Sequence, residues 1–176
     1  MKKLLIATLL LVLGTGIMAQ EAKTSKLLFK LPSVNVTDMN GKKINTSQLS
    51  NNGKPMIISF WATWCKPCVK ELTAISEVYQ DWQQETGVKL IAVSIDDSRT
   101  SPEVKTLVSG KNWEYQVLLD QNSDFKRAMN VNAVPHTFIV NGKGEVVWNH
   151  TSFSEGSELE LIKLIKKINA GEPIDK

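Results

Sequence analysis

The spacing of hydrophobic positions predicts alternating strands and helices along most of the chain. Short apolar runs at 55–60 and 88–95 are typical of buried strands. Between them, from residue 66 to 84, apolar residues recur every three or four positions, which indicates an amphipathic helix that ends before Gly87. A helix that connects two strands of one sheet makes those strands parallel. We therefore predict a βαβ unit.

Further elements on both sides of this unit continue an α/β pattern. Residues 20–31 carry few apolar side chains and are expected to lie against the side of the domain. The other predicted elements are a β-hairpin over 33–45, a helix capped by Ser101 that stops at Gly110, an extended segment over 113–119, a short helix capped by Ser123, an antiparallel hairpin over 134–148, and a last helix near Ser157 whose capping box includes Glu160.

The N-terminus has the features of an export signal. Two lysines precede an apolar block at 4–13, and small residues lead to Ala19. The block has about ten residues, against the roughly twenty that a membrane span needs. We expect a signal peptide over 1–19, followed by one domain over 20–176 that is exported, soluble and not stably inserted in a membrane.

Charge excludes some classes of partner. Loss of Lys2 and Lys3 with the signal lowers the net charge from +3 to +1, since all 18 acidic residues remain. No basic run survives in the mature chain. Nucleic acid and acidic membrane surfaces are therefore not indicated as partners.

The two cysteines, Cys65 and Cys68, lie at the start of the predicted helix. Free N–H groups and the positive end of the helix dipole favour a thiolate there, so the pKa of Cys65 should fall below the roughly 8.5 of a free cysteine. A two-residue spacer allows a disulfide, but so small a loop removes little entropy from the unfolded chain. The spacing therefore favours redox chemistry over a structural bridge, which remains the alternative.

Other uses of two cysteines fit the sequence less well. A zinc site would need two more ligands, and His136 and His150 are 14 residues apart. Haem attachment needs a histidine directly after the second cysteine, where Val69 stands. A peroxidase would have threonine in place of Ala62. We predict no metal and no cofactor besides the redox-active Cys65–Cys68 disulfide.

Three features resemble the exported TlpA/ResA-type branch of the thioredoxin superfamily: the N-terminal hairpin, the string from Phe60 through Cys68 to Glu71, and an added helix and strand at 102–119 before Val134-Pro135. The resemblance implies a three-layer α/β/α thioredoxin fold with a mixed central sheet, in which the hairpin and the inserted helix and strand precede a cis-proline. It implies a thiol:disulfide oxidoreductase. Cys65 would be the exposed nucleophile that forms a mixed disulfide, and Cys68 the thiol that resolves it.

The resemblance also assigns neighbouring residues. Pro135 would be the cis-proline that faces the cysteines and keeps metals away, and Val134 would offer its backbone to a substrate strand. Trp64 would line the substrate surface. Glu71 would tune the thiols in place of the buried aspartate that cytosolic thioredoxins carry where Ser59 stands here, although residue types alone favour a solvated glutamate.

Predictions also follow for one more residue of this string and for one residue of the strand after Pro135. Trp61 is expected in the core. His136 would either titrate near the thiols or be a half-exposed histidine with no role.

The family implies a direction and partners as well. We expect reduction of protein disulfides in the periplasm, in cytochrome c maturation or general redox homeostasis. A membrane thiol carrier would supply the electrons, and the protein would be a monomer. The alternatives are an oxidant or isomerase that installs disulfides, and a client-binding module with a structural disulfide.

Overall fold

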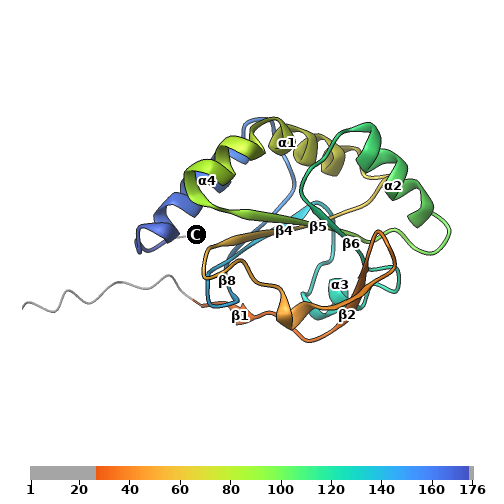
Figure 1. Ribbon diagram of the computed structural model, residues 1–176, viewed down its shortest axis with the longest axis horizontal. Coiled ribbons are helices and arrows are strands. Elements are labelled where there is room, and N and C mark those ends of the chain that lie inside the picture. The colour runs from red at the N-terminus through yellow and green to blue at the C-terminus, as the bar shows by residue number, and fades with distance from the viewer. Residues whose placement is uncertain (1–26, 175–176) are drawn as a thin grey trace, which may run out of the picture.

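A mixed sheet of eight strands forms the centre of the protein in the computed structural model, which describes residues 27–174. Its order is β1-β8-β7-β4-β5-β6-β2-β3 (Figure 1). Strands β4, β5 and β6 are mutually parallel, and every other neighbouring pair is antiparallel. The strands are β1 (Phe29–Lys30), β2 (Asn35–Asp38), β3 (Lys43–Asn45), β4 (Met56–Trp61), β5 (Lys89–Ser94), β6 (Gln116–Leu119), β7 (His136–Val140) and β8 (Glu145–Thr151).

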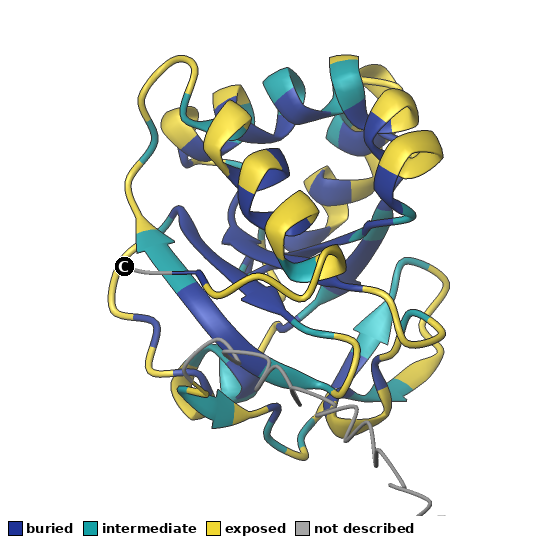
Figure 2. Cartoon of the chain, turned by 90° about the vertical axis from the view of Figure 1, so that its left-hand side faces the viewer, coloured by how far each residue is buried: buried dark blue, intermediate teal, exposed yellow. Residues whose placement is uncertain are grey.

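Helices cover both faces of this sheet. Helices α1, α2 and α4 lie on one side and α3 lies on the other, which confirms the three-layer α/β/α architecture (Figure 1). Figure 2 shows the central strands buried between these layers, with exposed residues on the outer surfaces of the helices. The helices are α1 (Lys66–Thr86), α2 (Ser101–Gly110), α3 (Asp124–Ala128) and α4 (Glu158–Asn169), and a 3-10 turn, η1 (Thr46–Gln48), follows β3.

The core is divided into two clusters by the sheet. Successive strand residues point to opposite faces, so Trp61 and Phe60 of β4, both fully buried, enter different clusters. Trp61 packs edge-on against Trp113 on the side of α1, with ring centroids 5.1 Å apart. Phe60 packs against Phe125 of α3, also at 5.1 Å. These large side chains anchor β4, the strand that leads to the cysteines.

The main elements agree with the sequence predictions. Strands β4 and β5 are parallel across α1, and both predicted hairpins form. One edge strand of the sheet was not predicted. Phe29 and Lys30 form this strand, β1, which pairs with β8. The predicted signal peptide over 1–19 lies outside the described residues.

Of the three predicted helix caps, one is wrong and two stand at the predicted residue without a side-chain capping bond. Ser101 is the first residue of α2, and Thr100 is its N-cap. Ser123 and Ser157 are the N-cap residues of α3 and α4, as predicted, but neither side chain makes a capping hydrogen bond, so the predicted capping box with Glu160 does not form. At α3 the Asp120 carboxylate takes this role, accepting from the N–H groups of the first turn at 3.1 and 2.7 Å.

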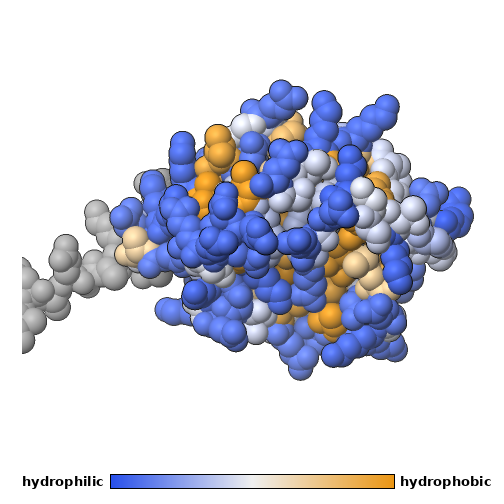
Figure 3. All heavy atoms as spheres, turned by 45° about the horizontal axis from the view of Figure 1, so that its top comes forward, coloured by the Kyte–Doolittle hydropathy of each residue, from blue (hydrophilic) through white to orange (hydrophobic). Residues whose placement is uncertain are grey.

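Much of the helical face is hydrophilic. Figure 3, which brings the side of α1, α2 and α4 forward, shows small separate hydrophobic areas within a polar surface. Within residues 27–174, no helix combines the length and the apolar character needed to cross a membrane.

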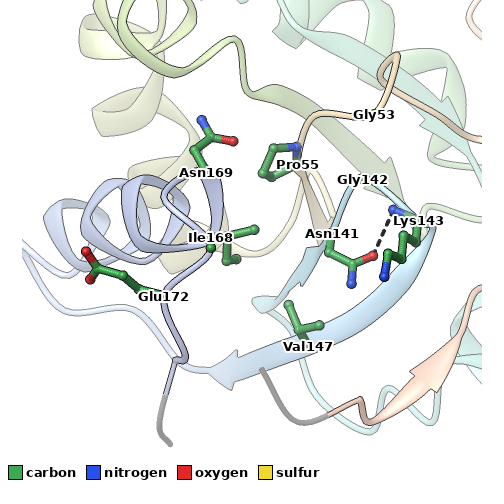
Figure 4. Close-up of a pocket in the computed structure, with 10 residues that line it drawn as sticks. Gly53, Pro55, Asn141, Gly142, Lys143, Val147, Ile168, Asn169 and Glu172 are labelled. Atoms are coloured by element: carbon green, nitrogen blue, oxygen red, sulfur yellow. Dashed lines mark hydrogen bonds between the residues drawn. The ribbon is translucent and has the colours of Figure 1, made fainter. Parts of the chain in front are cut away.

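A pocket of about 480 Å³ lies at the amino end of β4 (Figure 4). It is bordered by Pro55, by the turn between β7 and β8 at Asn141, and by Ile168 near the end of α4. A Cβ atom at Gly142 would overlap the carbonyl oxygen of Gly53, so the turn needs glycine there. Cys65 follows the other end of β4, and this pocket is therefore separate from the cysteine site.

Candidate active site

The Cys65–Cys68 disulfide stands at the head of α1. Cys65 is the N-cap, and its sulfur accepts a hydrogen bond from the Cys68 N–H at 3.3 Å. Pro67 fits the first turn because an N–H there would have no partner within the helix. After reduction, the same N–H and the helix dipole would stabilise a Cys65 thiolate.

The two cysteine residues differ slightly in exposure. Cys65 is 5% exposed and Cys68 is 0% exposed. Cys65 is therefore the slightly more exposed of the pair, but it is buried in this disulfide form, so the prediction of an exposed Cys65 is wrong here. Beside it, Trp64 is 62% exposed, whereas Trp61 is completely buried. The placement of the two tryptophans agrees with the sequence prediction.

A cis-proline lies against this disulfide. The Val134-Pro135 peptide bond is cis, as the resemblance implied. The Cys65 Sγ lies 3.7 Å from the Val134 carbonyl oxygen. The sulfur carries no proton in a disulfide, so this is a contact that becomes a possible thiol hydrogen bond after reduction. A backbone hydrogen bond fixes this segment, since the Ser152 N–H donates to the Pro135 carbonyl at 3.1 Å.

Glu71 is a buried residue of α1, about one helical turn after Cys68. The residue is 3% exposed, so the solvated surface glutamate that residue types favour is wrong. Its Oε1 accepts a hydrogen bond from Thr137 Oγ1 at 2.9 Å, and Thr137 Oγ1 lies 3.1 Å from Ser59 Oγ. A hydroxyl has one proton, so when Thr137 donates to Glu71, Ser59 donates to Thr137.

This environment changes the proton affinity of Glu71. Burial, the largest cause, raises its pKa from 4.5 to about 7. The Thr137 hydrogen bond works in the opposite direction, and the negative charge of Glu158 adds a further rise in the pKa. Glu71 is thus a carboxyl group that changes its charge near neutral pH.

Asp96 is a buried acid that the sequence analysis missed. It is fully buried, and its carboxylate accepts from the Thr63 N–H at 2.9 Å, the Thr63 hydroxyl at 2.6 Å and the Ser94 hydroxyl at 2.8 Å. These bonds fix the backbone just before Trp64. The sequence does contain a signal for this residue. Asp96 follows β5, the cysteine loop follows β4, and the carboxyl ends of these parallel neighbours meet at one edge of the sheet.

His136 is separated from this site by the sheet. Its ring stacks on Phe138 with centroids 4.3 Å apart, whereas Thr137 points to the opposite face and meets Glu71. The residue is 8% exposed, so the prediction of a half-exposed histidine is wrong. Burial is the main cause that lowers its pKa, against a hydrogen bond with Asn149 that raises it, and the charge of His150 lowers it further. The imidazole is therefore neutral at neutral pH.

The fold, the Cys-x-x-Cys disulfide at the head of α1 and the cis-proline beside it define an enzyme of the thioredoxin-like class, a thiol-disulfide oxidoreductase. A family model matches residues 29–149. The chain belongs to the AhpC/TSA family.

Curated relatives carry the same activity in their names. The thiol-disulfide oxidoreductase ResA of Bacillus thuringiensis is 34% identical over 137 residues, which cover 78% of this chain and 75% of the relative. ResA of Bacillus subtilis is 33% identical over 116 residues, covering 66% and 62%.

Solved structures agree with the fold. An uncharacterized thioredoxin-like protein of Porphyromonas gingivalis is 57% identical with a TM-score of 0.72, covering 80% of this chain and 92% of that one. StoA of Bacillus subtilis, 22% identical with a TM-score of 0.60 over 76% and 97% of the chains, supports the fold alone.

Proposed function

We propose that this protein is exported and reduces disulfides of client proteins through a mixed disulfide at Cys65. The observation that supports this most is the position of the Cys65 sulfur. This sulfur lies 3.7 Å from the Val134 carbonyl oxygen, and Cys65 as a residue is slightly more exposed than Cys68 and directly follows the exposed Trp64. Cys65 is 5% exposed and Cys68 is 0% exposed, so Cys65 is the cysteine that a client sulfur would reach in this proposal.

The reaction starts from the dithiol form. The Cys65 thiolate attacks one sulfur of the client disulfide, which forms the mixed disulfide and releases the first client thiolate. Cys68 then loses its proton and attacks Cys65 Sγ, which forms the enzyme disulfide and releases the second client thiolate. The client gains two electrons and, from solvent, two protons; the enzyme loses the same two electrons.

Glu71 is the group in this proposal that accepts the Cys68 proton. It lies one turn further along α1, and its pKa of about 7 allows it to take up and release a proton near neutral pH. The hydrogen bond from Thr137 holds the carboxyl in place without neutralising it. Proton transfer to Glu71 would produce the Cys68 thiolate that the second step needs.

Client binding would use the surface around the disulfide. Trp64 offers apolar contact area, and the backbone of Val134, held by the cis bond to Pro135, offers hydrogen-bonding groups to an extended client segment. An open hollow of about 530 Å³ between Thr63 and Leu107 borders the same loop.

The cellular setting is part of the proposal. The export features of residues 1–19 point to the periplasm. The thiol-disulfide oxidoreductase name of the ResA relatives supports the chemistry, and we place it outside the cytosol with cytochrome c maturation as the leading process. A membrane thiol carrier would return the protein, a monomer, to its dithiol form.

The reduction potential tests the direction of electron flow. Equilibration with glutathione or dithiothreitol at several pH values should give a reduction potential near that of thioredoxin, which is about −270 mV. A reduction potential near that of protein disulfide isomerase, about −180 mV, or of DsbA, about −120 mV, would overturn the proposal that the protein is a reductant. It would support an isomerase or an oxidant instead.

Trapping tests the mixed disulfide. In an export-compartment extract, Cys68→Ser should accumulate protein adducts that dithiothreitol releases, because the second attack is blocked. The matched variant Cys65→Ser should accumulate far fewer. Equal and negligible trapping by both variants would contradict catalysis and support a binding module with a structural disulfide.

A further inference from the structure

A short turn between β4 and α1 carries Cys65. Residues 62–65 form this hydrogen-bonded turn, in which the Cys65 N–H donates to the Ala62 carbonyl at 3.1 Å. Trp64, inside the turn, is exposed and belongs to neither core cluster. The Trp64 side chain therefore does not hold the turn in place by packing in the core.

Asp96 forms two hydrogen bonds with this turn. Its Oδ2 accepts from the Thr63 N–H at 2.9 Å and its Oδ1 accepts from the Thr63 hydroxyl at 2.6 Å, so each carboxylate oxygen binds a different group of one residue. The Ser94 hydroxyl donates to Oδ2 at 2.8 Å, and the Asp96 N–H donates to the Ser94 hydroxyl oxygen at 3.1 Å. Ser94 is the last residue of β5, so the carboxylate connects the turn to the end of a buried strand.

The burial of Asp96 depends on these bonds. A fully buried carboxylate is costly unless its oxygens are hydrogen-bonded. Within residues 27–174, no basic side chain forms an ion pair with Asp96. The hydroxyl groups of Thr63 and Ser94 and the Thr63 N–H therefore supply its stabilisation. Hydrogen bonds to a carboxylate are stronger than those to a neutral acceptor, so Thr63 is held firmly.

The position of the Cys65 sulfur depends on the same turn. Its Sγ lies 3.3 Å from the Cys68 nitrogen and 3.7 Å from the Val134 carbonyl oxygen. In the disulfide form, the covalent bond to Cys68 also fixes this sulfur. That bond is absent from the dithiol and from the mixed disulfide, so the turn then has to keep Sγ near Cys68. Attack within one molecule is fast when the two reacting atoms are held close together and aligned.

We propose that Asp96 is a positioning residue of this enzyme: by binding Thr63 it keeps Cys65 Sγ within reach of Cys68, which stabilises the disulfide relative to the dithiol and speeds the second thiol attack. The inference rests on the proposed function and deepens it. Loss of a bond to the turn gives the dithiol more conformational freedom, whereas the S–S bond still constrains the disulfide form. The dithiol is then favoured, and the reduction potential becomes less negative.

The second attack can be followed with Ellman's reagent, a small aromatic disulfide. The Cys65 thiolate attacks one sulfur of the reagent, which releases one thionitrobenzoate and leaves the other bound to Cys65. Cys68 loses its proton and attacks Cys65 Sγ, which releases the second thionitrobenzoate. The reagent gains the two electrons that the enzyme dithiol loses. The second release is intramolecular, so its rate reports how well the two sulfurs are positioned.

Thr63→Val in the full protein is the main variant, because it removes the bond to Oδ1 and keeps a branched side chain of similar size. We expect stopped flow to show a second release about three- to tenfold slower, the range for one hydrogen bond, and a much smaller change in the first release. Equilibration with dithiothreitol should give a reduction potential less negative by about 15 to 30 mV, since a tenfold change in the equilibrium constant corresponds to about 30 mV.

Two related variants test the same bonds. Thr63→Ser keeps the hydroxyl and should stay closer to the wild type than Thr63→Val in both measurements. Asp96→Ala removes both bonds to the turn and should change both measurements further in the same direction.

Thr46→Val is the matched control. It also removes a buried threonine hydroxyl, which donates to the Pro32 carbonyl, but it lies in the turn after β3. A loss of stability that the dithiol and the disulfide share leaves the reduction potential unchanged, so this variant should keep the wild-type potential and second-release rate.

Two outcomes would overturn the role of Asp96. One is a Thr63→Val protein with the wild-type potential and second-release rate, and the other is an equal change in Thr46→Val, which would indicate a general effect of lost stability. Failure of the proposed function would be distinct, because the wild type itself would then have an oxidising potential or reduce no protein disulfide. The differences between the variants and the wild type would still decide the role of Asp96.

Discussion

Replacement of Glu71 by glutamine should change how the stability of the oxidised protein depends on pH. The folded state raises the Glu71 pKa from 4.5 to about 7, so between these values it binds a proton that the unfolded chain has lost. The free energy of unfolding therefore falls as the pH rises through this window. At about 1.4 kcal/mol for each pH unit, the full loss is about 3 kcal/mol, most of it between about pH 5 and 8.

Urea denaturation of the disulfide form at several pH values measures this effect without interference from free thiols. The free energy of unfolding of Glu71→Gln, relative to the wild type, should rise by about 2 to 3 kcal/mol from about pH 5 to 8. In a domain of this size, each kcal/mol of change in the free energy of unfolding shifts Tm by about 2–4 °C.

The test is the slope against pH, because a buried glutamine also adds amide protons that need partners and so shifts the whole curve. Glu77→Gln, an exposed acid on the same helix, should run parallel to the wild type. Parallel curves for Glu71→Gln and the wild type would refute the buried, proton-holding carboxyl.

Two further substitutions test the surroundings of the site. Asp96→Ala leaves the Thr63 N–H, the Thr63 hydroxyl and the Ser94 hydroxyl without their acceptor, and should destabilise the protein by roughly 2–4 kcal/mol in urea denaturation. Asp81→Ala, at an exposed acid on α1, should change little, and an equal loss in both would contradict a specific role for Asp96. The folded state lowers the pKa of His136, so stability is lost as the pH falls through about 6.5, and His136→Thr should flatten this acid-side loss. The same variant should keep the wild-type pH profile of the reduction potential, and a displaced profile would show that the histidine does act on the thiols.

Local patterns were enough to place the cysteine pair. The strand before it and the helix after it have periods that a single sequence displays, and the alternation along β4 separates Trp61 from Phe60. The long-range contacts were harder. Helical spacing puts Glu71 on the same face as Cys68 and Ile75, but a buried acid needs a partner, and Thr137 is 66 residues away.

The missing capping bonds at α3 and α4 have a local cause that composition does not reveal. A capping serine needs an extended backbone so that its oxygen reaches the first N–H groups. Ser123 is left-handed with φ 57° and Ser157 is already helical, so neither oxygen is directed toward those groups. Asp120 can cap α3 because the turn after β6 brings its carboxylate back to the helix start.

The two rims of the sheet have a consequence for the behaviour of the folded protein at high concentration. The outermost strands are β1, with two residues, and β3, with three. Each carries an exposed lysine, Lys30 or Lys43. Short edge strands with a positive charge offer a second chain little backbone to extend in register. The two outermost strands among the described residues therefore favour little edge-to-edge growth of this eight-stranded sheet into aggregates.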